Sequence, residues 1–127
     1  GIGEGDDAQA ALSFLSEYSG VDPARLGIMG YSFGGMVALS SGMHNNQVKA
    51  VAAVSPVISA GLLAEVPKPV FIVYGTEDEV VLPSTIIKET SLLEPGNIQA
   101  VEGADHFWWG REAKAAEMLS DFFVKSL

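Results

Sequence analysis

Short apolar segments alternate with helical patterns along the whole of this 127-residue chain. The apolar segments, at 26–29, 48–54, 70–74 and 98–101, are rich in Val, Ile and Ala and predict buried strands. Helices are predicted beside them, at 6–18, 33–43, 83–93 and 111–125. Right-handed βαβ crossovers over a parallel sheet produce this alternation. We therefore expect one α/β domain over residues 1–127, with about four parallel strands flanked by helices.

Composition disfavours several classes of function. The net charge of −9 disfavours nucleic acid as a partner, and the absence of cysteine excludes disulfides, thiolate metal sites and a cysteine nucleophile. The longest apolar runs, at 50–54 and 69–74, are far shorter than the roughly 18 residues of a membrane span. The first residues are acidic, unlike a signal peptide. We expect a cytoplasmic protein without membrane partner, metal or other cofactor.

The sequence Gly-Tyr-Ser-Phe-Gly at 30–34 matches the pattern Gly-x-Ser-x-Gly and lies between a predicted strand and a predicted helix. A strained turn at this place holds a serine hydroxyl clear of the sheet, and flanking glycines let neighbouring backbone approach the turn without Cβ clashes. Ser32 is therefore a candidate nucleophile. The alternative is a glycine-rich turn with a solvated serine.

A serine hydroxyl needs a base to take its proton, and the chain has two histidines. His44 stands at the far end of the helix that follows Ser32, about 18 Å along its axis, too far to reach the serine. His106 follows the last predicted strand, and loops after parallel strands open on one edge of a sheet. His106 is the candidate base, with an ordinary surface histidine as the alternative.

An acid that orients the histidine should leave the same edge. Three carboxylates, Glu77, Asp78 and Glu79, follow the predicted strand at 70–74. We favour Asp78, because a short side chain orients an imidazole well and Val80 and Val81 can close the loop over it. The two glutamates are expected in solvent. The order serine, aspartate, histidine would then join three strand ends.

Three segments carry a resemblance to a known fold family: Gly-Tyr-Ser-Phe-Gly-Gly at 30–35, Gly-Thr-Glu-Asp at 75–78 and Gly-Ala-Asp-His-Phe at 103–107. They resemble the C-terminal half of α/β-hydrolase-fold enzymes, above all small lidless bacterial esterases and hydrolases related to dienelactone hydrolase. The resemblance implies Ser32 as nucleophile, His106 as base, Asp78 as orienting acid and the Phe33 backbone N–H as an oxyanion donor. The implied activity is hydrolysis of small esters through an acyl-enzyme on Ser32.

The same resemblance implies an N-terminal half with about four more strands, including a loop that supplies a second oxyanion N–H. No His-Gly-Gly-type segment is present in this sequence. The alternative function is therefore a truncated or split, non-catalytic remnant that self-associates or needs a complementary chain. The predicted strand from Leu26 to Met29 would be an exposed sheet edge, so we expect a homo-oligomer formed through this edge, or alternatively by packing of the segment 2–18 onto a neighbouring copy.

Three aromatic residues, Phe107, Trp108 and Trp109, follow the candidate base. We expect them to pack against the C-terminal helix, as large apolar side chains near an amphipathic helix usually do. The alternative is an apolar wall for an acyl group or an exposed patch.

Overall fold

A single parallel sheet forms the centre of the molecule. The computed structural model describes residues 3–127. Its four strands are β1 (Leu26–Tyr31), β2 (Val48–Val54), β3 (Val70–Gly75) and β4 (Ile98–Val101). Their spatial order is β1-β2-β3-β4, and every pair of neighbours is parallel. The predicted α/β class and the four parallel strands are confirmed.

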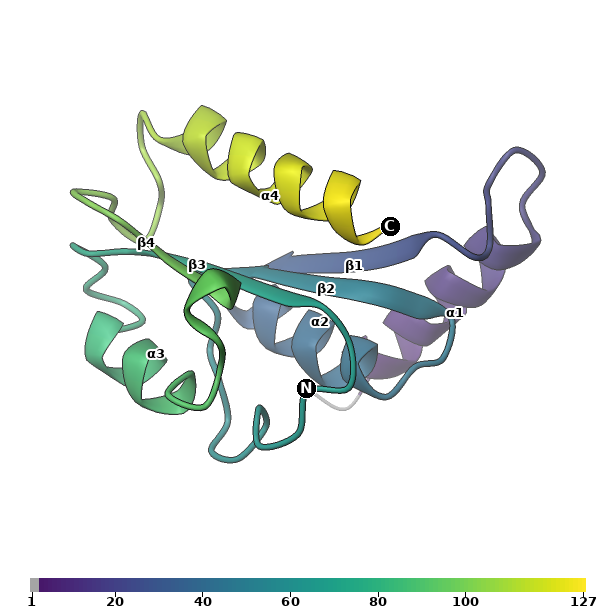
Figure 1. Ribbon diagram of the computed structural model, residues 1–127, viewed down its shortest axis with the longest axis horizontal. Helices are drawn as coiled ribbons and strands as arrows, with labels where there is room; N and C mark the ends of the chain where they lie inside the picture. Colours follow the sequence, from purple (N-terminus) through teal and green to yellow (C-terminus); the bar gives the residue numbers. More distant parts are fainter. Residues whose placement is uncertain (1–2) are drawn as a thin grey trace.

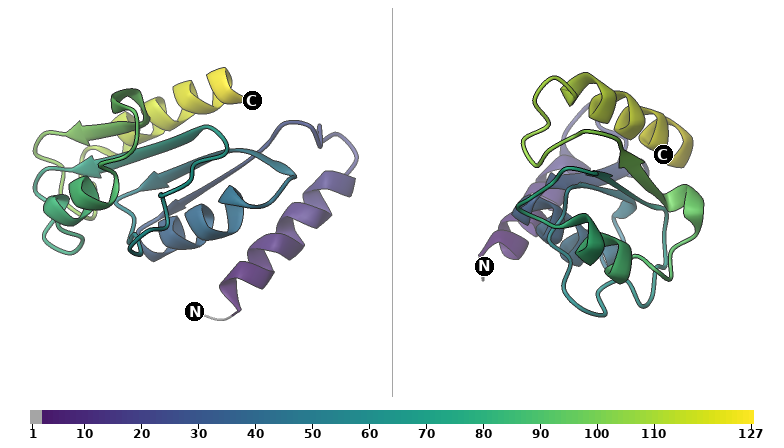
Figure 2. Two further views of the ribbon diagram at one scale, coloured as in Figure 1. Left: turned by 60° about the horizontal axis from the view of Figure 1, so that its bottom comes forward. Right: turned by 90° about the vertical axis from the view of Figure 1, so that its left-hand side faces the viewer.

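Helices lie on both faces of the sheet (Figure 1). They are α1 (Glu4–Glu17), α2 (Phe33–Met43), α3 (Pro83–Glu89) and α4 (Glu112–Ser126). In Figure 1, α4 covers one face alone, while α2 and α3 lie on the other. Figure 2 shows α1 outside α2, at the margin of that second layer. This is the layering expected of alternating strands and helices.

One helix is shorter than its sequence predicts. The predicted helix at 83–93 ends at Glu89, and a short 3-10 helix, Pro95–Asn97, precedes β4. The Thr90 hydroxyl donates to the carbonyl of Ile86 at 2.7 Å, which closes the last turn. Pro95 holds Glu94 in extended backbone, which separates the turn after α3 from the 3-10 helix.

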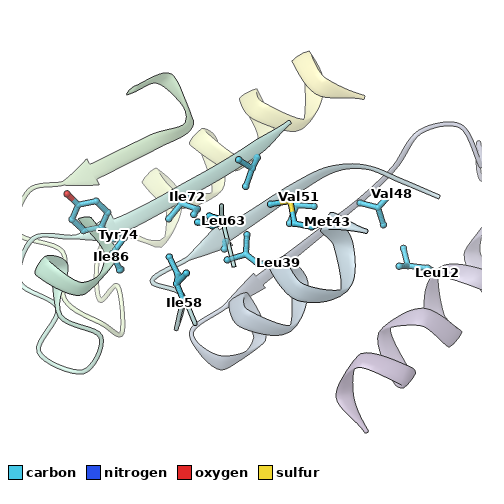
Figure 3. Close-up of a cluster of buried hydrophobic side chains, with 12 residues drawn as sticks. Leu12, Leu39, Met43, Val48, Val51, Ile58, Leu63, Ile72, Tyr74 and Ile86 are labelled. Atoms are coloured by element: carbon cyan, nitrogen blue, oxygen red, sulfur yellow. The ribbon is translucent and has the colours of Figure 1, made fainter. Parts of the chain in front are cut away.

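Two apolar cores lie on the two faces of the sheet. The larger core, drawn in Figure 3, joins α2 and α3 to the sheet and takes Leu12 from α1 at its margin. The smaller core lies under α4, which contributes Ala115 and Leu119. Residues of β2 and β3 enter both cores, because alternate side chains of a strand point to opposite faces. The two central strands are therefore buried on both sides, as their continuous apolar sequences predict.

Strand β1 lies at one edge of the sheet. It pairs with β2 and with no other strand among residues 3–127. Met29, in the middle of β1, is 50% exposed, and Phe14, Leu15 and Tyr18 of α1 are exposed as well. The position of β1 agrees with the expected edge. No helix in the part of the chain described is long and apolar enough to cross a membrane.

Candidate active site

Ser32 occupies the turn between β1 and α2 in a conformation that side-chain-bearing residues rarely adopt. Its φ is 54° and its ψ is −119°. Hydrogen bonds hold this backbone on both sides: its N–H donates to the Val54 carbonyl at 2.9 Å, and its own carbonyl accepts from Gly35 and Val57 at 3.0 and 3.2 Å. The end of β2 and the loop after it therefore fix the turn that presents the serine.

The two glycines around Ser32 differ in what surrounds them. A Cβ on Gly30 would stand 1.9 Å from the Gly34 carbonyl oxygen, so no larger residue fits while the turn keeps its shape. A Cβ on Gly34 would meet nothing within 4 Å among the residues described. The sequence-based prediction that both glycines avoid Cβ clashes therefore agrees with the structure at Gly30 and is wrong at Gly34.

The structure brings Ser32, His106 and Asp78 together from three strand ends. The Ser32 Oγ lies 3.0 Å from His106 Nε2, and His106 Nδ1 lies 2.8 Å from Asp78 Oδ2. His106 and Asp78 are buried, at 6% and 2% exposure. Because Asp78 accepts the hydrogen on Nδ1, Nε2 has a free lone pair toward the serine hydroxyl. The arrangement can therefore move the serine proton onto the imidazole.

The Asp78 carboxylate is fixed by the loop that follows it. Its Oδ1 accepts the backbone N–H groups of Val80 and Val81 at 2.9 and 2.8 Å, which leaves Oδ2 for His106. The sequence predicts that the hydrophobic Val80 and Val81 close the loop over Asp78; the structure closes it through their backbone N–H groups instead, with the Val80 side chain 62% exposed. Both oxygens of the buried carboxylate thus have partners, which a buried charge requires.

A close backbone contact joins the Asp78 loop to the His106 loop. A Cβ on Gly75 would stand 2.1 Å from the Ala104 carbonyl oxygen, and the same carbonyl accepts the Glu77 N–H at 3.0 Å. Glycine at the end of β3 is what permits this approach. The two loops are consequently held side by side, with Asp78 facing His106.

The structure separates the other candidate residues from this cluster. His44 is exposed and follows the last residue of α2, the end opposite Ser32, as predicted. Glu77 and Glu79 are exposed, also as predicted. The Phe33 N–H is the first of α2 and donates to no group among residues 3–127, because the first N–H groups of a helix have no partner within the helix. It is available to a ligand.

A hollow of about 550 Å³ lies beside His106. Carboxylates and apolar side chains share its lining, which comprises Thr76, Glu77, Asp78, Glu79, Val80, Asp105, His106 and Phe107.

Across residues 3–127, no group of three or more His, Asp or Glu side chains is placed to hold a metal ion.

The three aromatic residues after His106 do not share one environment. Trp108 is buried with Ala115 and Leu119 of α4, as predicted, and its Nε1–H donates to the Ser55 hydroxyl at 3.0 Å. Phe107 and Trp109 are 62% and 75% exposed, so the predicted packing is wrong for these two. Successive residues of the loop point in different directions, and only Trp108 points under α4.

Sequence reasoning missed two hydrogen bonds that support the site. The Tyr31 hydroxyl donates to the His106 backbone carbonyl at 2.6 Å, and Trp108 donates to Ser55 as described above. Each bond joins residues more than 50 positions apart. No spacing in the sequence signals them.

A strained serine turn at the carboxyl edge of a parallel sheet, with a histidine and a buried aspartate in line, defines the α/β-hydrolase class of fold. Solved structures share that fold. A protein of unknown function from Agrobacterium tumefaciens superimposes with a TM-score of 0.85 at 22% identity, over 98% of this chain and 61% of that one. An α/β serine hydrolase without lid from Xanthomonas campestris gives 0.78 at 22% identity, over 98% and 57%.

The sequence model of the Dienelactone hydrolase family matches residues 4–116, and the chain belongs to this family. An uncharacterised protein of Rickettsia prowazekii is 27% identical over 137 residues, which cover 98% of this chain and 57% of that protein. The chain thus spans about three fifths of the length of these relatives. The expected resemblance to hydrolases related to dienelactone hydrolase, and to lidless bacterial ones, is confirmed.

Proposed function

We propose that the chain is a serine hydrolase that cleaves small carboxylic esters through an acyl-enzyme on Ser32. The observation that carries this proposal is the continuous line of hydrogen bonds from Ser32 through His106 to Asp78. Membership of the dienelactone hydrolase family supports a hydrolase, and the strained backbone of Ser32 supports its role as nucleophile.

The reaction follows from the geometry of the three side chains. The Ser32 Oγ attacks the ester carbonyl carbon while its proton passes to His106 Nε2, and the Asp78 carboxylate stabilises the imidazolium that forms. The Phe33 N–H donates to the oxyanion. The intermediate collapses by breaking the bond to the alkoxy oxygen, which takes the proton from His106 and leaves as alcohol. Water, deprotonated by His106, then attacks the acyl carbon; the bond to the Ser32 Oγ breaks, the Oγ takes the proton back from His106, and the acid is released.

A fluorophosphonate probe and p-nitrophenyl acetate test this function. We expect the probe to label the native chain and acetate ester to be turned over, and both reactions to disappear in Ser32→Ala. Circular dichroism of the variant checks that it is folded. A well-folded native chain that neither labels nor turns over ester, or labelling that persists in Ser32→Ala, overturns the proposal.

A second candidate function is that of a non-catalytic or complementing half. The relatives extend beyond the part that this chain matches, and in this fold family a loop of that further part supplies a second oxyanion N–H. Under this alternative, a second polypeptide supplies the further oxyanion donor. A folded chain that fails to label alone, but labels when a complementary chain is added, would support it.

We also propose that the edge of β1 pairs with the same edge of a second copy, which makes a homo-oligomer. The strand Leu-Gly-Ile-Met-Gly-Tyr carries no charge, and Met29 at its middle is half exposed, whereas isolated proteins usually protect such edges. Sedimentation velocity at micromolar concentration should give a dimer or larger species, and Met29→Lys should shift it toward monomer. A stable native monomer contradicts the proposal.

A further inference from the structure

Tyr31 connects Ser32 with the loop that carries His106. It immediately precedes Ser32 at the end of β1, and its hydroxyl donates to the His106 carbonyl oxygen at 2.6 Å. Its ring also lies against the imidazole, with centroids 5.2 Å apart and planes tilted by 37°. Two consecutive residues, Tyr31 and Ser32, therefore contact the backbone and the side chain of the same histidine.

The bond from Tyr31 is the only hydrogen bond that the backbone of His106 makes within residues 3–127. The loop that carries His106 has no regular secondary structure between β4 and α4, so no ladder or helix fixes its position. Trp108 anchors the same loop two residues later, through its bond to Ser55. Without the Tyr31 hydroxyl, the backbone of His106 itself would have no hydrogen bond within residues 3–127, and the loop would be held only on either side of it, at Ala104, Asp105 and Trp108, and by the side chain of His106.

The surroundings of Tyr31 favour its role as a donor. Burial, and then the negative charges of Asp78 and Asp105, raise the pKa of the Tyr31 hydroxyl above its ordinary value. The hydroxyl consequently keeps its proton throughout the neutral range. A phenol that stays protonated donates one hydrogen bond, and the carbonyl of His106 accepts it.

We propose that Tyr31 is a positioning residue for the hydrolytic reaction: it holds the His106 backbone so that Nε2 stays in line with the Ser32 hydroxyl. This inference rests on the proposed function. Because Tyr31 is the last residue of β1 and Ser32 follows it directly in the chain, a movement of the end of β1 carries nucleophile and base together. The distance over which the proton must pass is thereby kept constant, and proton transfer is sensitive to that distance.

Tyr31→Phe removes the hydroxyl and keeps the ring beside the imidazole. Tyr18→Phe is the matched control, because the Tyr18 hydroxyl is on an exposed side chain and bonds to no described residue. We expect fluorophosphonate labelling and kcat for p-nitrophenyl acetate to fall about five- to tenfold in Tyr31→Phe, the effect of one ordinary hydrogen bond. KM should be unchanged, and Tyr18→Phe should match the native chain.

Ring-nitrogen NMR of the two histidines provides a readout that does not depend on activity. In Tyr31→Phe the His106 signals should move and its Nδ1 hydrogen should exchange faster with water, while the signals of His44 stay in place and serve as internal reference. Neither change is expected in Tyr18→Phe. Circular dichroism confirms that both variants are folded.

The outcomes separate this inference from the proposed function. Labelling of Tyr31→Phe at the native rate with unmoved His106 signals overturns the positioning role, and so does a raised KM with unchanged kcat, which would place Tyr31 in substrate binding. A native chain that never labels overturns the proposed function instead. In that case the His106 signals of Tyr31→Phe alone decide whether Tyr31 positions the histidine.

Discussion

Replacing Gly30 with Ala should damage both the fold and the site, whereas the same change at Gly34 should not. The new methyl group at position 30 would stand 1.9 Å from the Gly34 carbonyl oxygen and 2.7 Å from the Gly35 nitrogen, where real Cβ atoms keep at least 3.0 Å. The backbone of the turn must therefore move by roughly 1 Å. The obstructing atoms belong to the main chain, so no side-chain rotation can relieve the contact.

The cost follows from that displacement. Overpacking of this kind costs about 1–3 kcal/mol, and we expect the upper end because backbone has to move. For a chain of this size, 3 kcal/mol lowers the Tm by about 10 °C. A displacement of about 1 Å at the reacting groups costs about 100-fold in rate, so labelling of Ser32 should fall by that factor.

Gly34→Ala is the control, because its methyl group enters open space on a helix. Alanine is the better helix former by about 0.5–1 kcal/mol, so the Tm should stay equal or rise slightly and labelling should be unchanged. Thermal unfolding by circular dichroism and the time course of fluorophosphonate labelling measure both effects. A Gly30→Ala variant that melts and labels like the native chain refutes the reasoning, as does equal damage at both positions.

Three further predictions concern the acid, a partly buried lysine and the alkaline limit of stability. In Asp78→Asn, the two backbone N–H groups that bond Oδ1 should hold the amide oxygen, so the amide NH₂ faces His106 and Nε2 becomes the protonated nitrogen. Labelling of Ser32 should then fall about 10⁴-fold with little loss of stability. A near-native labelling rate would argue against Asp78 as the orienting acid. Lys68→Met removes the ammonium that donates to three carbonyls, those of Gly42 in the last turn of α2, Asn45 after it and Val48 at the start of β2, so urea unfolding should show a loss of about 1–2 kcal/mol. Lys49→Met, which loses one exposed contact, should lose less than about 0.5 kcal/mol. Because the pKa of Tyr31 is raised in the folded state, the unfolded chain releases this proton first as the pH passes about 10, so the free energy of unfolding falls above that pH. It should fall less steeply in Tyr31→Phe. Equal slopes of the two proteins in a urea series across the alkaline range contradict a raised pKa of Tyr31.

Much of the fold is readable from the sequence because burial leaves a clear pattern. The predicted bounds of β2, β4 and α2 coincide with those in the structure, since continuous apolar or small-residue segments end at polar turns. The helix predicted at 83–93 is too long, because Leu93 packs on the core from a turn and Leu92 is exposed, so the apolar spacing there does not mark a helix. Periodicity tells where side chains face the core, but local hydrogen bonds decide where a helix ends.

The candidate site likewise has a part that can be predicted from the sequence and a part that cannot. Ser32, Asp78 and His106 could be brought to one edge of the sheet by topology alone, because residues directly after parallel strands share that edge. Tyr31 and the pair of Ser55 and Trp108 could not. Their bonds depend on where loops turn, and Ser55 and Trp108 both adopt left-handed backbone, with φ of 43° and 59°, that no residue pattern predicts for side-chain-bearing residues.

The contacts around the site form a series that joins all four strand ends. The carbonyl of Val54, the last residue of β2, holds the Ser32 turn that follows β1. The Ala104 carbonyl after β4 lies against Gly75 at the end of β3, and Tyr31 at the end of β1 holds His106. Every bond that sets the path of the proton from Ser32 to His106 therefore lies within residues 3–127. A complementary polypeptide at the β1 edge would act on substrate binding and on the oxyanion, and would leave the geometry of proton transfer as it is. Its addition should accordingly raise labelling without moving the His106 NMR signals.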